Sequence, residues 1–264
     1  LAPFGCEMSK FWHVNKHKQV TDAVHKYPTK ICLQLLHAGR YSYHPFSVSA
    51  SKVKAPINPF TPKEMSVRQI KNTIKDFAYS SSLAAKAGYD GVEIMGSEGY
   101  LINQFTCVRV NKRTDEWGGC VENRMRLARE LIEETKEAVG DSCAVAVRYS
   151  LTGTLDNYSL VKDDYCEMLE RMADLPDLWD ITIHDYTIEM GSSRYVREAA
   201  QEEVVSFVKS VSSKPVVGVG RFTSPDTMVR QVKKGILDFV GAARPSIADP
   251  FIPSKIREDR LEDI

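Results

Sequence analysis

The stretch from Gly88 to Arg124 reads GYDGVEIMGSEGYLINQFTCVRVNKRTDEWGGCVENR. It opens with an apolar run, Gly91 to Met95, that is bounded by glycines and too short for a helix, which predicts a buried parallel strand. A long polar loop follows, and a helix is expected to begin near Glu122, where apolar residues recur at helical spacing. Loops at the carboxyl ends of buried strands are where α/β enzymes place their chemistry. The loop is therefore either a functional segment or a solvated connector.

Similar apolar runs recur along the whole chain and alternate with helical patterns, as a parallel sheet requires. Six strands are predicted, at residues 30–36, 91–95, 143–149, 178–184, 214–221 and 236–241. Eight are needed to close an α/β barrel. Thr61-Pro-Lys-Glu64 resembles a helix start, because a capping residue precedes a proline and an acid.

Composition excludes several classes of protein. The 264 residues contain 35 basic and 35 acidic side chains, so no basic excess points to nucleic acid or an anionic membrane. The longest apolar runs are strand-sized, and no signal peptide opens the chain. Six scattered cysteines without a C-x-x-C pair predict free thiols, no metal or iron–sulfur site within these residues, and a cytoplasmic location.

Two predicted strands are each interrupted by a residue that needs a partner. Gln34 must find hydrogen bonds, because an unpaired buried amide is costly. It is either bonded to backbone or available to a ligand. Arg148 must find an anion to offset its desolvation, either a ligand or an internal Asp or Glu.

The ends of the predicted strands carry further candidate residues. His37 and Arg40 stand at a strand-to-loop corner. Two small-residue turns with arginines, Gly220-Arg221 and Ala243-Arg244, follow the last two strands. Loops at that position in barrels often bind a phosphate through backbone N–H groups, and arginine can pair with its charge.

The order G-x-D-G-V-E-I, G-Y-L-x-N-Q-F and N-x-R-x-D-x-x-G-G-x-x-x-N-R resembles the old yellow enzyme family of flavin-dependent oxidoreductases, in the branch of 2,4-dienoyl-CoA reductase and trimethylamine dehydrogenase. The resemblance runs from Ile31 to Pro250. It implies a TIM (β/α)8 barrel lacking here its first two strands, so that residues 1–264 form an incomplete FMN-binding domain of a longer, multidomain chain. FAD and a 4Fe–4S cluster are then possible elsewhere in that chain, not on these residues.

The resemblance also implies roles for the candidate residues. Gln34 and Arg148 would contact the flavin pyrimidine, and Gly220, Arg221, Ala243 and Arg244 the FMN phosphate. Catalysis would involve Tyr100 as proton donor, together with Glu98 and His184. A small-molecule substrate would contact His37, Arg40, Met95 and Tyr186.

The residue order Gly96-Ser-Glu98-Gly-Tyr100 favours a dienoyl-CoA reductase type, which passes hydride from NAD(P)H through flavin to an activated C=C bond. A phenol remains protonated at neutral pH and can donate that proton. Strand residues 179–183 and 217–221 instead look closer to the amine dehydrogenases. An FMN-dependent amine dehydrogenase or N-demethylase is therefore the alternative function. A third possibility is a non-flavin phosphate-binding barrel enzyme or a fragment without activity.

Overall fold

The computed structural model describes residues 7–151, 162–182 and 196–264. Within them lies a parallel sheet with the strand order β1-β4-β5-β6-β7-β8, which is chain order, as in a barrel that is open along one side. The strands are β1 (Cys32–Leu35), β4 (Gly91–Gly96), β5 (Ala144–Ser150), β6 (Leu178–Thr182), β7 (Val216–Gly218) and β8 (Phe239–Val240). All six predicted strands are confirmed, and the barrel fold with them.

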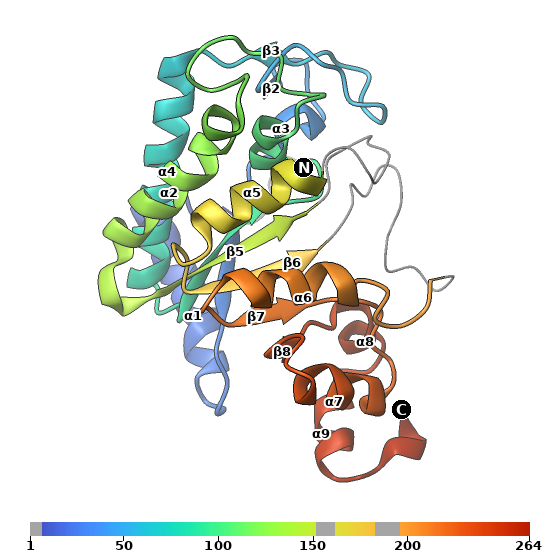
Figure 1. Ribbon diagram of the computed structural model, residues 1–264. Coiled ribbons are helices and arrows are strands. Elements are labelled where there is room, and N and C mark those ends of the chain that lie inside the picture. Colours follow the sequence, from blue (N-terminus) through green and yellow to red (C-terminus); the bar gives the residue numbers. More distant parts are fainter. Residues whose placement is uncertain (1–6, 152–161, 183–195) are drawn as a thin grey trace.

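Helices lie along one face of this sheet and form the outer layer of the barrel (Figure 1). They are α1 (Val14–Val24), α2 (Val67–Lys86), α4 (Val121–Val139), α5 (Lys162–Met172), α6 (Glu202–Val211) and α7 (Pro225–Lys233), and the chain continues through α8 (Ala243–Ala248) and α9 (Ile252–Arg257). Among the described residues, no helix is both long enough and apolar enough to cross a membrane.

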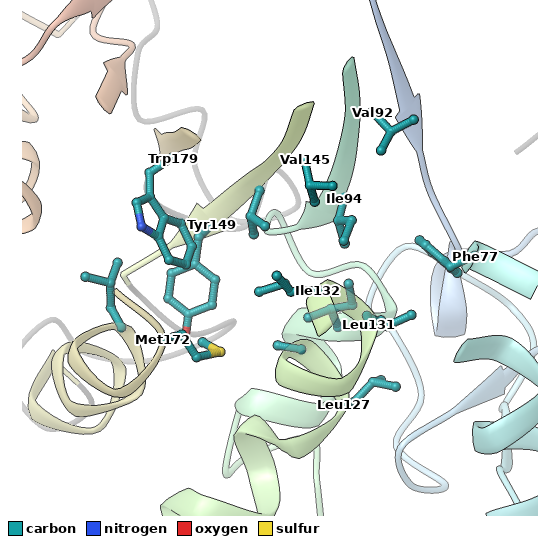
Figure 2. Close-up of a cluster of buried hydrophobic side chains, with 14 of the residues drawn as sticks. Phe77, Val92, Ile94, Leu127, Leu131, Ile132, Val145, Tyr149, Met172 and Trp179 are labelled. Carbon is teal, nitrogen blue, oxygen red and sulfur yellow. The ribbon is translucent and has the colours of Figure 1, made fainter. Parts of the chain in front are cut away.

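The hydrophobic core lies between the sheet and these helices. Figure 2 shows Val92, Ile94, Val145 and Tyr149 of β4 and β5 on the side of the sheet that faces the helices, with Phe77 of α2, Leu127, Leu131 and Ile132 of α4 and Met172 of α5. Trp179 of β6 is fully buried in the same layer, and its indole Nε1 donates to the carbonyl of Ala173 at 2.8 Å. Burial of these side chains fixes the outward-facing half of every strand.

The opposite, inward-facing half of the strands is polar. Gln34 of β1 is paired with Glu93 of β4, and Arg148 of β5 with Asp180 of β6. Register partners in a parallel pair lie on the same face of the sheet. The alternation of the strands therefore brings these four residues to the inner face of the barrel.

The structure corrects two local predictions. Lys63 and Glu64 form a short strand, β3, paired with β2 (Val48–Ser49), and do not begin a helix. Helix α2 begins after Ser66, whose hydroxyl accepts from the backbone N–H of Gln69 in a capping box. The loop predicted after β4 contains a short helix, α3 (Leu101–Thr106). The helix predicted near Glu122 is confirmed as α4.

Candidate active site

The turn that leads from β4 into α3 has an unusual backbone. Glu98 has a φ of 57° and Gly99 a φ of 82°, and a positive φ is uncommon for any residue with a side chain. Two side chains of α3 hold this turn, because Asn103 Oδ1 accepts from the Gly99 N–H at 2.9 Å and Gln104 Nε2 donates to the Gly99 carbonyl at 2.7 Å. The Asn-Gln pair of the sequence motif thus fixes the position of Glu98.

Gln104 also locks the corner after β1 to the same turn. Its Oε1 accepts from the backbone N–H of Arg40 at 3.1 Å and from Ser49 Oγ at 2.9 Å. Gly39 has a φ of 58°, and a Cβ there would lie 2.2 Å from Gln104 Oε1, so only glycine fits. The carbonyl of His37 accepts from the Leu101 N–H at 3.1 Å. The ends of β1 and β4 are therefore one rigid unit.

Tyr100 lies at the N-terminus of α3 and is half-buried. Its ring packs edge-on against Tyr41 with 5.9 Å between ring centroids. Met95 is buried two residues before the turn, and its sulfur accepts from Ser97 Oγ. Tyr100, Glu98 and Met95 are thus brought together where β4 ends, as predicted, although their catalytic and substrate roles stay predictions.

Arg148 lies on the inner face of the barrel within reach of two carboxylates. Its Nη2 lies 2.9 Å and its Nε 3.3 Å from Glu98 Oε1, and its Nη1 donates to Asp180. Burial acts to lower the pKa of Arg148, but the charges of Asp180 and Glu98 raise it. The guanidinium has five N–H donors, and the three used here leave others for a further acceptor. Of the two partners that the sequence left open, the structure shows the internal ion pair.

His37 and Arg40 differ in their surroundings. His37 Nδ1 accepts from the Gly39 N–H at 3.0 Å, so the other ring nitrogen, Nε2, carries the proton. Burial lowers the pKa of His37, which keeps the ring neutral. Arg40 has no exposed surface, contacts the carbonyl of Lys54, and lies 5.4 Å from the Tyr41 ring centroid. The substrate role predicted for both residues stays a prediction.

The predicted phosphate turns lie at the ends of two paired strands. The Gly241 N–H donates to the Gly218 carbonyl at 2.9 Å, which holds the segments after β7 and β8 side by side. A Cβ on Gly220 would lie 3.3 Å from the Cα of Ala199, so the backbone there passes close to its neighbour. Arg221 has a φ of 58°, and Ala243 and Arg244 open α8.

Two predicted residues, His184 and Tyr186, lie outside the described residues. Conversely, the sequence analysis did not select Glu93 and Asp180, which lie beside Gln34 and Arg148. Each is the single charged residue in an apolar strand, the same signal that selected Gln34 and Arg148. Burial, and then the charge of Asp180, raise the pKa of Glu93 to about 7.

The parallel sheet, the polar inner face and the loops at its carboxyl edge define an α/β-barrel enzyme. Within that class, the chain belongs to the NADH:flavin oxidoreductase / NADH oxidase family, whose model matches residues 10–263.

Solved structures and curated proteins that resemble the chain are longer than it is. It is 40% identical to the 6-hydroxypseudooxynicotine amine oxidase of Pseudomonas geniculata N1, with a TM-score of 0.90 over 97% of this chain and 40% of that one. The histamine dehydrogenase of Rhizobium sp. 4-9 is 38% identical, with a TM-score of 0.87 over 97% of this chain and 38% of that one. The dimethylamine dehydrogenase of Hyphomicrobium sp. (strain x) is 35% identical over 76% of this chain and 28% of that protein.

FMN binding is typical of this family, and the residues present fit that group. A flavin pyrimidine edge has an N–H donor between carbonyl acceptors. The inner face has a matching set, because the Gln34 amide supplies an acceptor and a donor and Arg148 supplies donors. The turns after β7 and β8 carry Arg221 and Arg244 near the ends of two paired strands, and arginine pairs with phosphate.

Proposed function

We propose that the protein is an FMN-dependent amine dehydrogenase or oxidase. The observation that carries the proposal is the excess of carboxyl groups at the inner face and mouth of the barrel. Glu93, Glu98 and Asp180 surround a single guanidinium, that of Arg148. Even with Glu93 protonated, two negative charges face one positive charge within this cluster of described residues. A site with this balance attracts a substituted ammonium ion and disfavours an anion.

Glu98 is the carboxylate best placed to meet such a substrate. It lies in the turn beside Tyr100, and 26% of its side-chain surface is exposed, compared with 11% for Asp180. The backbone of the next residue, Gly99, is held by Asn103 and Gln104, so the turn that carries Glu98 does not depend on a ligand for its position. Glu98 would bind the cationic nitrogen, and the hydroxyl of Tyr100 would contact the substrate next to it.

Bound FMN would supply the two-electron acceptor that amine oxidation needs. The chain would hold it through Gln34 and Arg148 at the pyrimidine and through Gly220, Arg221, Ala243 and Arg244 at the phosphate. The three similar proteins described above, which are named as an amine oxidase, a histamine dehydrogenase and a dimethylamine dehydrogenase, support the same class.

Reduction of an activated C=C bond is the second candidate, and the order of residues from Gly96 to Tyr100 favours it. That reaction needs a proton donor, whereas amine oxidation needs a cation site. Tyr100 serves the first requirement and Glu98 the second, so the two functions depend on neighbouring residues that can be changed separately.

The experiment is anaerobic stopped-flow reduction of the flavin in the full-length protein. A panel of primary, secondary and tertiary amines is compared with NAD(P)H, followed by reoxidation with an enoyl or dienoyl thioester. We expect an amine to bleach the flavin. Glu98→Gln should then raise the amine concentration for half-maximal reduction by about 10-fold, the scale of one charge-assisted contact.

The matched control is Glu134→Gln, which removes an exposed carboxylate in the second half of α4, away from the carboxyl ends of the strands. It should leave amine reduction unchanged. Reduction by NAD(P)H alone, with reoxidation by thioester and slowing in Tyr100→Phe, would support the second candidate. A purified protein that takes up no FMN would refute both.

A further inference from the structure

Glu93 and Asp180 belong to the carboxyl groups of the proposed site, but the proposed function gives neither of them a contact with a ligand. Glu93 Oε2 accepts from Gln34 Nε2 at 2.5 Å. Asp180 accepts from Arg148 Nη1 through Oδ2. Each carboxyl group therefore has one oxygen engaged by a proposed flavin-binding residue and a second oxygen to be accounted for. A role for these two residues in flavin binding rests on the proposed function.

The second oxygen of Asp180 lacks a donor. Oδ1 is buried and accepts no hydrogen bond within the part of the chain that the structure describes. Buried acceptors are rarely left without a donor. Glu93 lies on the same inner face, and a hydrogen bond from its carboxyl group would satisfy Oδ1 of Asp180. Two ionised carboxylates cannot form that bond, so one of the pair must carry a proton.

The surroundings assign the proton to Glu93. Asp180 forms an ion pair with the guanidinium of Arg148. Glu93 has only the amide of Gln34 on its other side. The charged or titratable groups that act on Glu93 or on its neighbours are Cys32 of β1, Glu98 of the turn after β4, Arg148 of β5 and Asp180 of β6. The raised pKa of Glu93 agrees with this assignment.

The protonated acid also fixes the direction of the Gln34 amide. Oε2 of Glu93 is an acceptor in both protonation states, so it always takes the N–H of Gln34 and turns the Gln34 carbonyl Oε1 away from Glu93. Oε1 of Gln34 forms no hydrogen bond to other described residues. It is thereby presented as an acceptor, which matches the N–H of a flavin pyrimidine.

We propose that Glu93 is a positioning residue of the flavin site. One oxygen of Glu93 accepts from the Gln34 amide and so directs the Gln34 carbonyl toward the ligand. The other oxygen of Glu93 donates a hydrogen bond to Asp180. Asp180 in turn keeps Arg148 on the inner face. A chain of four side chains from β1, β4, β6 and β5 then presents one acceptor and one cation to the pyrimidine edge.

The test is the FMN dissociation constant of the full-length apoprotein, measured by quenching of flavin fluorescence at pH 6. Glu93→Leu cannot hold Gln34 and should weaken FMN about 10-fold, the scale of one hydrogen bond. Glu93→Gln should rescue binding, because its carbonyl accepts from Gln34 and its N–H donates to Asp180 as the acid does. Gln34→Ala should weaken FMN by a similar factor, and Glu93→Leu should add nothing in that background.

A full 10-fold loss from Glu93→Leu in the Gln34→Ala background would overturn the positioning role. Equal losses of FMN affinity from Glu93→Gln and Glu93→Leu would overturn the assignment of a proton to Glu93. Should Glu93→Leu fail to fold, the wild type and Glu93→Gln decide the matter by infrared spectroscopy of the apoprotein. The carbonyl band of a protonated acid should be present at pH 6 in the wild type and absent in Glu93→Gln, and a wild type without it overturns the proposal. A wild type that shows the band and binds FMN, but whose flavin is reduced by no amine, refutes the proposed function alone.

Discussion

The two faces of the sheet are built from the same strands and differ in what holds them. On the outer face, side chains such as Ile94 and Trp179 are stabilised by packing against helices (Figure 2). On the inner face, their sequence neighbours Glu93 and Asp180 are stabilised by charge and hydrogen bonds. The stability that packing provides depends on the shapes of the side chains and changes little with pH. The stability that a charged cluster provides depends on which of its members carry protons. Each face should therefore respond to a different kind of change.

The largest effect is expected on the outer face. Trp179→Ala removes a fully buried ring and its hydrogen bond to Ala173, and should lower the free energy of unfolding by about 3–5 kcal/mol at every pH. Chemical denaturation measures it. Tyr27→Ala, at a side chain that is 69% exposed, is the control and should change stability by less than about 0.5 kcal/mol. A small or pH-dependent loss of stability in Trp179→Ala would show that packing is not what stabilises the outer face.

An intermediate effect is expected on the inner face. Arg148→Met leaves Glu98 and Asp180 without their cation and should lower the free energy of unfolding by about 2–3 kcal/mol at pH 8, less than for a fully buried pair because 19% of the Arg148 side chain is exposed. The loss comes from unpaired negative charge, so it should shrink when the pH is low enough to protonate carboxylates.

The control for this change is Arg171→Met. Arg171 also contacts two carboxylates, those of Glu122 and Glu167, but half of its side chain is exposed. Its loss should be much smaller than the loss at Arg148, because solvent screens an exposed ion pair. Losses of equal size at Arg148 and Arg171 would mean that the inner cluster is merely a solvated ion pair.

Much of the fold could be predicted from the sequence because the outer face imposes it. Every strand is short and apolar, and its order among helical patterns specifies a parallel sheet. The short helix α3 was missed because the hydrogen bonds of Asn103 and Gln104 that hold its first turn become visible only in three dimensions. The helix start predicted at Thr61-Pro-Lys-Glu64 was wrong, whereas the Ser66 and Gln69 capping signature that does begin α2 is present in the sequence.

The candidate site could be predicted only in part, for a physical reason. Gln34 and Arg148 stand out because a lone polar residue in an apolar run is expected to be buried and to need a partner. For Gln34 the expected burial is wrong, because β1 is an edge strand and Gln34 is exposed there. Glu93 and Asp180 carry the same signal, but their importance follows from the register that pairs them with Gln34 and Arg148. Register depends on long-range packing and is not written in any single strand.

The smallest effect should have the opposite sign, and it compares two adjacent residues on opposite faces. Glu93 has a pKa of about 7 in the folded protein, above that of an unfolded glutamate. Its contribution to stability is therefore complete at pH values below the unfolded pKa and is lost as the pH rises toward 7. Glu93→Gln cannot ionise and keeps both hydrogen bonds, so it should exceed the wild type by about 1 kcal/mol in free energy of unfolding at pH 8.5 and fall behind or equal it at pH 5. Ile94→Val, one residue away in the core, should instead lose about 1 kcal/mol at both pH values. Denaturant unfolding of the three proteins at the two pH values measures the difference. A Glu93→Gln variant that is less stable than the wild type at pH 8.5 would show that the carboxylate itself holds the inner face together, and that the two faces differ less than their chemistry suggests.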